Sequence, residues 1–172
     1  MTAIINGSSP TVTFSDGTTQ ATSAIVSGYV PYANLPAGSV LQVVNATYST
    51  QSSVNGTTPV ASGLSVSITP KFSTSKIFVL VSQNGIYSAT NGILAVQSLK
   101  RGSTSLFNFD YISGYSVSGG GCGGSATTNY LDSPATTSST TYSTAIACGS
   151  ANTINWNNGG CLSSITVMEI AG

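Results

Sequence analysis

Residues 64–83 read LSVSITPKFSTSKIFVLVSQ and predict two β-strands of different kinds. In residues 64–69, apolar side chains alternate with Ser and Thr, which is the pattern of a strand with one buried face. Residues 76–83 contain a continuous apolar run, which predicts a central strand covered on both faces. Neither segment has the 3.6-residue period of a helix, so the stretch favours a β-sheet protein.

Strand-like segments recur along the rest of the chain, and turn signals separate them. Arg101-Gly102-Ser103 and Asn157-Asn158-Gly159-Gly160 predict turns. A Gly-rich segment from Ser113 to about Pro134 predicts a long loop. Eight short strands of this kind predict an all-β fold, an antiparallel β-sandwich of jelly-roll type. The six further strands are expected at residues 40–49, 93–100, 104–112, 141–148, 152–156 and 162–170.

The first 36 residues differ from the rest. They contain a small predicted hairpin with a turn at Asp16-Gly17 and apolar side chains at Val12 and Phe14. Two such strands bury too little apolar surface to be stable alone. We therefore expect these four residues to serve assembly or docking. The predicted domains are an N-terminal stem or docking segment, residues 1–36, and a knob domain, residues 37–172.

Charged side chains are scarce in this chain. They make up 5% of the residues, against about 25% in soluble domains, and four cations balance four anions. A neutral chain offers no electrostatic footprint for nucleic acid or for an anionic membrane. No apolar run approaches the ~20 residues of a membrane-spanning helix, so membrane insertion is not expected. An almost uncharged Ser/Thr surface is typical of a protein that lives in an assembly.

Groups for acid–base catalysis are also scarce. The chain has no histidine, which excludes Ser-His-Asp and Cys-His arrangements. Turn, strand-edge or ion-pair roles are the favoured interpretation of its carboxylates, over a catalytic pair. We expect no enzymatic activity, no cofactor and no metal site. The four carboxylates are Asp16, Asp110, Asp132 and Glu169.

The pairing of four other groups is open from the sequence. Cys148 and Cys161 lie near the ends of adjacent predicted strands, where they could approach each other, but buried free thiols are favoured for them and for Cys122. Glu169 is expected to form an ion pair, within the chain or between subunits. Its candidate partners are Lys71, Lys76 and Arg101.

Tyrosine and asparagine side chains bracket the predicted loop and offer a candidate recognition site. Aromatic faces stack on the C–H faces of neutral sugars, and amides pair with their hydroxyls. The alternative, which we favour, is that these tyrosines are core or strand-edge residues. The candidate glycan-binding residues are Tyr111, Tyr115, Asn129, Tyr130 and Tyr142.

An ordered set of short segments resembles a domain common in virion proteins of tailed bacteriophages, notably marine and cyanobacterial phages. The segment FSDGTTQ, residues 14–20, likewise resembles one that often precedes such domains in phage fibres. The resemblance implies a trimeric jelly-roll knob on a short β-rich stem in a virion appendage, and it carries no catalytic motif. The ordered segments are residues 38–44, 67–70, 75–79, 99–104 and 165–170.

These observations favour a virion structural protein, a homotrimeric phage fibre or fibre tip that adheres to the host through residues 113–140. The expected partners are two further copies, other virion proteins bound through the N-terminal segment, and a host surface glycan. The alternative is a capsid decoration or cement protein or a head fibre, which copy number per particle would separate from a tail fibre. A glycan depolymerase is a third hypothesis, disfavoured by the scarcity of acid–base groups. The expected location is the virion, after assembly in the host cytoplasm.

Overall fold

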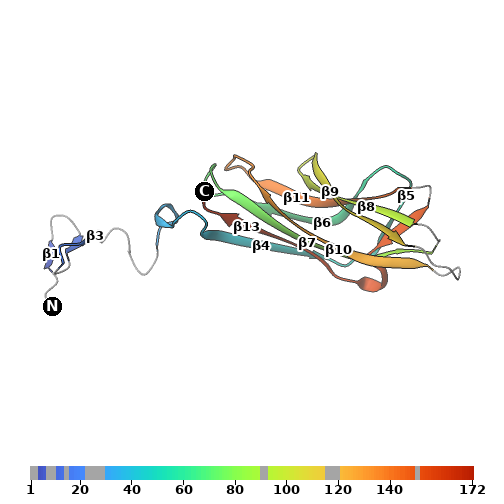
Figure 1. Ribbon diagram of the computed structural model, residues 1–172, viewed down its shortest axis with the longest axis horizontal. Coiled ribbons are helices and arrows are strands. Elements are labelled where there is room, and N and C mark those ends of the chain that lie inside the picture. The colour runs from blue at the N-terminus through green and yellow to red at the C-terminus, as the bar shows by residue number, and fades with distance from the viewer. Residues whose placement is uncertain are drawn as a thin grey trace. The chain divides into compact units, whose positions relative to one another are not determined.

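The computed structural model describes residues 4–6, 11–13, 16–21, 30–89, 93–114, 121–149 and 152–172. The chain divides into two compact units, Met1–Ser39 and Val40–Gly172. We call them the N-terminal unit and the sandwich and describe each by itself (Figure 1).

The N-terminal unit contains a three-stranded antiparallel sheet in the order β1-β2-β3. The predicted hairpin is its β2–β3 pair, and β1 is an additional strand. At the turn between β2 and β3, Asp16 Oδ1 accepts hydrogen bonds from the Thr18 amide at 2.9 Å and the Thr18 hydroxyl at 2.6 Å. Gly17 in this turn has a φ of 81°. Phe14 lies outside the described residues. The strands are β1 (Ile4–Asn6), β2 (Thr11–Thr13) and β3 (Thr19–Ala21), and the 3-10 turn η2 (Tyr32–Asn34) follows.

The sandwich consists of two antiparallel sheets, which confirms the predicted fold class. One sheet has six strands in the order β4-β13-β7-β12-β5, with β10 also paired to β7, and the other has the order β6-β11-β8-β9. The strands are β4 (Val40–Tyr48), β5 (Ser52–Asn55), β6 (Val60–Ile68), β7 (Lys76–Ser88), β8 (Ile93–Arg101), β9 (Thr104–Gly114), β10 (Cys122–Asp132), β11 (Thr140–Cys148), β12 (Thr153–Trp156) and β13 (Ser163–Ile170). The 3-10 turn η3 (Asn158–Gly160) lies within the predicted turn before β13.

We call the two ends of the sandwich proximal and distal. The proximal end is where β4 begins and β13 ends, at the left of the sandwich in Figure 1. The distal end is the opposite end, where β4 ends at Tyr48 beside the first residue of β13, Ser163.

The central strand β7 is covered on one face only, which corrects the prediction for residues 76–83. Its inward side chains, such as Val79 and Val81, are buried, while the alternating Phe78 and Leu80 remain half-exposed. An apolar run is therefore compatible here with a sheet that has one open face. The strand bulges at Gly85, which has a φ of 63°. A side chain there would come within 2.7 Å of the backbone nitrogen of Asn158. Both the positive φ and this close approach therefore require glycine.

The predicted Gly-rich loop is wrong over residues 122–132, which form the 11-residue strand β10. The strand pairs with β7 along its length, with one register shift between Gly124 and Ala126. Ala126, Tyr130 and Asp132 face inward, and these positions lack the aliphatic side chains that mark a strand in the sequence. Residues 115–120 of the predicted loop lie outside the described residues, and residues 133–139 connect β10 to β11.

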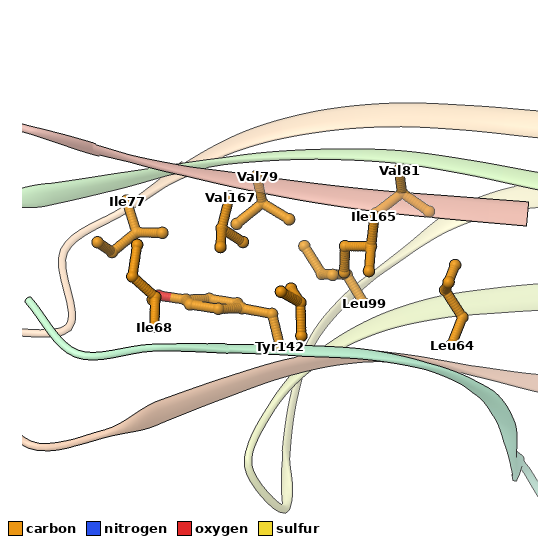
Figure 2. Packing of buried hydrophobic residues seen from close by; sticks show 10 residues of the cluster. Leu64, Ile68, Ile77, Val79, Val81, Leu99, Tyr142, Ile165 and Val167 are labelled. Carbon is orange, nitrogen blue, oxygen red and sulfur yellow. The ribbon is translucent and has the colours of Figure 1, made fainter. Parts of the chain in front are cut away.

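The core contains two apolar clusters, one toward each end. The proximal cluster joins both sheets around Tyr142, Ile77 and Ile165 (Figure 2). The distal cluster surrounds Trp156, whose indole nitrogen donates to the Ser62 carbonyl at 2.6 Å. The other buried members of the proximal cluster are Leu64, Val66, Ile68, Val79, Val81, Leu99 and Val167, and those of the distal cluster are Val54, Ile86, Ala95, Ile146, Cys148 and Ile154.

A layer of hydrogen-bonded polar side chains lies between the two clusters. Thr144 shares a 2.5 Å hydrogen bond with the Ser62 hydroxyl and donates to Gln83 Oε1 at 2.9 Å. Gln83 Nε2 donates to the Ser163 hydroxyl at 3.0 Å, and that hydroxyl donates to Asn157 Oδ1 at 2.6 Å. All five side chains are buried. We call this set the polar layer.

The described cysteines are not joined to each other. Cys148 is buried in the distal cluster, as expected, but Cys161 is exposed after η3, where the prediction of burial is wrong. Cys122 begins β10.

Candidate binding surfaces

The residues predicted to bind a glycan do not form one cluster. Tyr142 is fully buried, and its hydroxyl donates to Asp132 Oδ2 at 2.6 Å. Tyr130 faces the core, where its ring centroid lies 5.1 Å from that of Phe107. Asn129 is exposed on the opposite, outer face of the same sheet. Strand alternation thus separates neighbours in sequence. Both tyrosines are core residues, which agrees with the favoured interpretation and not with a glycan-binding role.

The two remaining members of that predicted site contribute no described side chain. Tyr111 lies in β9, opposite Val96 of β8, and Tyr115 lies outside the described residues. Asn129 is therefore the one predicted glycan-binding residue whose described side chain is available at the surface.

Asp132 is the centre of a structural cluster at the proximal end. Both of its carboxylate oxygens accept from Arg101 Nη1, at 2.9 and 2.8 Å, in addition to the Tyr142 hydroxyl. Burial and the hydrogen bond to Asp132 both raise the pKa of Tyr142 above its ordinary value. Asp132 is the last residue of β10 and not a loop residue as expected, and it is buried and joins the two sheets through Arg101.

Glu169 is held mainly by amides, although an ion pair was expected. It is fully buried, and its Oε1 accepts from the Lys71 backbone amide at 2.6 Å while its Oε2 accepts from Gln42 Nε2 at 2.6 Å. Gln42 also donates to the Thr69 carbonyl at 2.7 Å. The Arg101 guanidinium, one of the predicted partners, pairs with Asp132. The carboxylate thus fixes the β6–β7 turn against β13.

Charge is distributed unevenly along the sandwich. Seven of the eight charged residues of the chain lie in this unit. Six of them lie toward the proximal end, and Asp110 lies opposite Gln97 at the middle of β8. The distal turns at residues 49–51, 56–59 and 157–162 contain no charged residue. Those three turns therefore contain only neutral residues: Ser, Thr, Asn, Gln, Gly, Pro, Cys and Leu.

The distal turn at residues 157–162 is held in place by buried polar groups. Asn157 is fully buried with a φ of 52°, and its Nδ2 donates to the Thr50 carbonyl at 3.1 Å. Asn84 Nδ2 donates to the Leu162 carbonyl at 2.7 Å. The Leu162 side chain nevertheless is 57% exposed. An apolar side chain is thus displayed on a braced turn, and sequence reasoning did not single it out because its exposure depends on the turn geometry.

The outer face of the six-stranded sheet carries an apolar strip near the proximal end. The register places Val43, Met168, Phe78 and Leu131 side by side across β4, β13, β7 and β10. Val43 is 56% exposed and Leu131 is 48% exposed. We define the apolar strip as these four residues with Val40 and Ile170 at the adjoining strand ends.

A groove of about 340 Å³ lies on the same face, one to two rows further toward the distal end. Polar side chains line it around Leu80, and Thr166 at its edge accepts a 2.8 Å hydrogen bond from Asn45 Nδ2. The groove is uncharged and offers hydroxyls and an amide. Its outward-facing lining residues are Leu80, Ser82, Thr127, Asn129, Ser164 and Thr166.

A second groove of about 340 Å³ lies beside the Arg101–Asp132 pair. Arg101, Gly102 and residues 134–141 contribute its walls, which are rich in Thr and Ser hydroxyls. Ala135 in this connection has a φ of 52°, an uncommon conformation for a residue with a side chain. The guanidinium is already neutralised by Asp132, so the groove has no net charge to attract an ion.

Among the described residues, no group of three His, Cys, Asp or Glu side chains is placed to hold a metal ion. Over the same residues, no helix is long and apolar enough to cross a bilayer.

Comparisons with known proteins gave matches among solved structures only. No family model matches the sequence, and no curated protein matches it. Among solved structures, T=1 particles derived from infectious bursal virus give a TM-score of 0.47 at 13% identity, over 76% of this chain and 32% of that chain. The Gt strain of infectious bursal disease virus gives 0.45 at 10% identity, over 78% of this chain and 39% of that chain.

A third similar structure is that of Bacillus endospore appendages, described as a family of disulfide-linked pili. It gives a TM-score of 0.32 at 11% identity, over 80% of this chain and 96% of that chain. The chain spans about a third of the length of the viral chains that it matches. All three TM-scores lie below 0.5.

Proposed function

We propose that this chain is a virion structural protein, a homotrimeric phage fibre or fibre tip that adheres to a neutral host-surface glycan through the distal end of its sandwich. The observation that carries the proposal is the charge-free distal end, with its braced turn and exposed Leu162. The N-terminal unit serves as the docking or stem segment.

The distal end has the chemistry that a neutral carbohydrate requires. Sugar hydroxyls pair with amides, hydroxyls and backbone groups, and sugar C–H groups contact apolar side chains such as Leu162. Recognition sites on β-proteins are commonly turns positioned by a rigid scaffold. Here Asn157 and Asn84 fix the turn before a ligand arrives, so less conformational entropy is lost on binding.

The N-terminal unit supports an assembled state. Its described sheet has three strands of three residues each, the short end of the range for strands in globular proteins, so we expect further contacts to stabilise it. Copies of the chain, or a docking surface on another virion protein, supply the missing contacts. Val12 in β2 and the Asp16-Gly17 turn remain the proposed assembly residues, with Phe14 between them in the sequence.

The experiment combines a mass measurement with a binding assay on the full chain. We expect a trimer in solution and binding to host cells or to a panel of surface glycans. Leu162→Ser should weaken binding about tenfold, and the effect of salt on binding should be small because no charge lies at the distal end. Thr137→Ala, an exposed change at the proximal end, is the matched control. A stable monomer would overturn the trimer, and equal binding by the two variants would overturn the distal site.

A further inference from the structure

We propose that the apolar strip is the surface through which the sandwiches of different copies of this chain contact one another. The copies then converge at their proximal ends, and their distal ends remain apart and exposed. This inference rests on the proposed homotrimer, and it names the contact surface, which the proposed function leaves open.

The strip is continuous because strand register, rather than sequence proximity, assembles it. Met168 lies directly opposite both Val43 and Phe78, and Phe78 lies opposite Leu131. One apolar row therefore crosses four hydrogen-bonded strands on the open face of the sheet. Val43 and Leu131, at its two margins, are the most exposed of these four side chains. A row of this kind on an open sheet face is characteristic of an interaction site.

The charges around the strip are compatible with a second identical surface. The two carboxylates nearest to it in the strands, Asp132 and Glu169, face inward and are buried with hydrogen-bond partners. Lys76, at the start of β7 opposite Ile170, is the one charged residue whose position places it on this face. Apposed copies would therefore desolvate no carboxylate of the face, and Lys76 lies at its margin within reach of solvent.

The chain connectivity selects another copy as the occupant. The N-terminal unit ends at Ser39, and the next residue, Val40, belongs to the strip. Association of the β1–β3 sheets would thus hold the strips of different copies on tethers of about nineteen residues, which span at most roughly 65 Å at about 3.5 Å per residue. Tethering of this kind converts contact between the strips into an intramolecular event with a high effective concentration. A partner that does not bind the N-terminal unit gains nothing from this arrangement.

The test is the mass of the full chain by sedimentation velocity over a concentration series. Val43→Asp and Leu131→Asp place a carboxylate in the strip, and like charges apposed in a contact repel one another. We expect each variant to raise the concentration at which the oligomer dissociates by about a hundredfold or more. Thr47→Asp is the matched control, because Thr47 is exposed on the same strand and face but lies two rows away. It should leave dissociation within about threefold of the parent chain.

Two further measurements separate the outcomes. Val43→Thr keeps the branched shape and should raise the concentration at which the oligomer dissociates about tenfold. Melting followed by circular dichroism shows whether each variant is folded. If the parent chain is an oligomer and Val43→Asp behaves like Thr47→Asp, the strip is not the contact, and the proposed homotrimer stands. If the parent chain is a monomer at all concentrations, the proposed homotrimer itself fails, and the strip has no second copy to bind.

Discussion

The two ends of the sandwich are built from different chemistry. The proximal end contains the Arg101–Asp132 ion pair, the buried Glu169 carboxylate and the apolar strip. The distal end contains no charge, and neutral side chains such as Asn157 brace its turns. The difference teaches that ionic groups in this protein stabilise buried contacts between strands and sheets, while the end proposed for recognition is neutral. The predictions below test each end in turn.

Removal of the Trp156 side chain should have the largest effect. Trp156→Ala empties the centre of the distal cluster and leaves the Ser62 carbonyl without its indole donor. We expect the free energy of unfolding to fall by about 4 kcal/mol, as for other buried aromatic truncations. Urea denaturation measures it. Trp156→Phe keeps most of the volume and should lose about half as much; equal losses for both variants would mean that packing is not what holds the distal end.

Loss of the Asp132 carboxylate should have the largest effect at the proximal end. Asp132→Ala leaves the Arg101 guanidinium and the buried Tyr142 hydroxyl without their common acceptor. We expect a loss of about 3 kcal/mol in the free energy of unfolding. Asp110→Ala, at the half-buried middle of β9, is the control and should cost less than about 0.5 kcal/mol. Similar values for the two would contradict the structural role of the ion pair.

Tyr142→Phe should remove about 2 kcal/mol at neutral pH, because a hydrogen bond to a carboxylate is lost. The pKa of Tyr142 is raised above its ordinary value of 10.0 in the folded protein. Above that value the unfolded chain releases a proton that the folded protein retains, so alkali favours unfolding. The parent chain should therefore lose stability more steeply than Tyr142→Phe between pH 10 and 11, as measured by denaturation at each pH. Parallel slopes would contradict the assignment.

Substitution of Gln97 should change the free energy of unfolding least, and it should raise that free energy where the other substitutions lower it. The side chain is fully buried on β8 between Ala95 of the distal cluster and Leu99 of the proximal cluster, and neither its Nε2 nor its Oε1 has a hydrogen-bond partner among the described residues. Gln97→Met keeps the length and removes the polar groups. It should raise the free energy of unfolding by about 1 kcal/mol, and a loss of that size would show that a bound water satisfies the amide.

Local patterning predicted much of the fold but little of the candidate surfaces. The alternation in residues 64–69 and the apolar run around Val79 predict strands whatever the order in which the strands pair. Strand β10 was missed because its inward side chains include Ala126 and Asp132, whose burial depends on the neighbouring strands. The apolar strip was missed for a related reason: Val43, Phe78, Leu131 and Met168 are far apart in sequence, and only the register brings them together.

The charge asymmetry was equally invisible before the topology was known. Lys76 and Asp132 are separated by more than fifty positions in the sequence, yet the antiparallel pairing of β7 and β10 puts them at one end of the same sheet. Tyr130 and Tyr142 were grouped by their position around a supposed loop. Once residues 122–132 form a strand, its two-residue period decides which side each neighbour faces, and Tyr130 points away from Asn129.

The polar layer has a consequence for how the chain finds its native pairing. A slip of one strand by two residues preserves the inward and outward alternation, so apolar contacts alone discriminate poorly against it. Such a slip would place Gln83 or Thr144 against aliphatic neighbours and leave Ser163 without its partner. Each mispaired group would then be buried without a hydrogen bond. The polar layer thus specifies the strand register in a sandwich whose strands otherwise have similar sequences of Ser, Thr and Val.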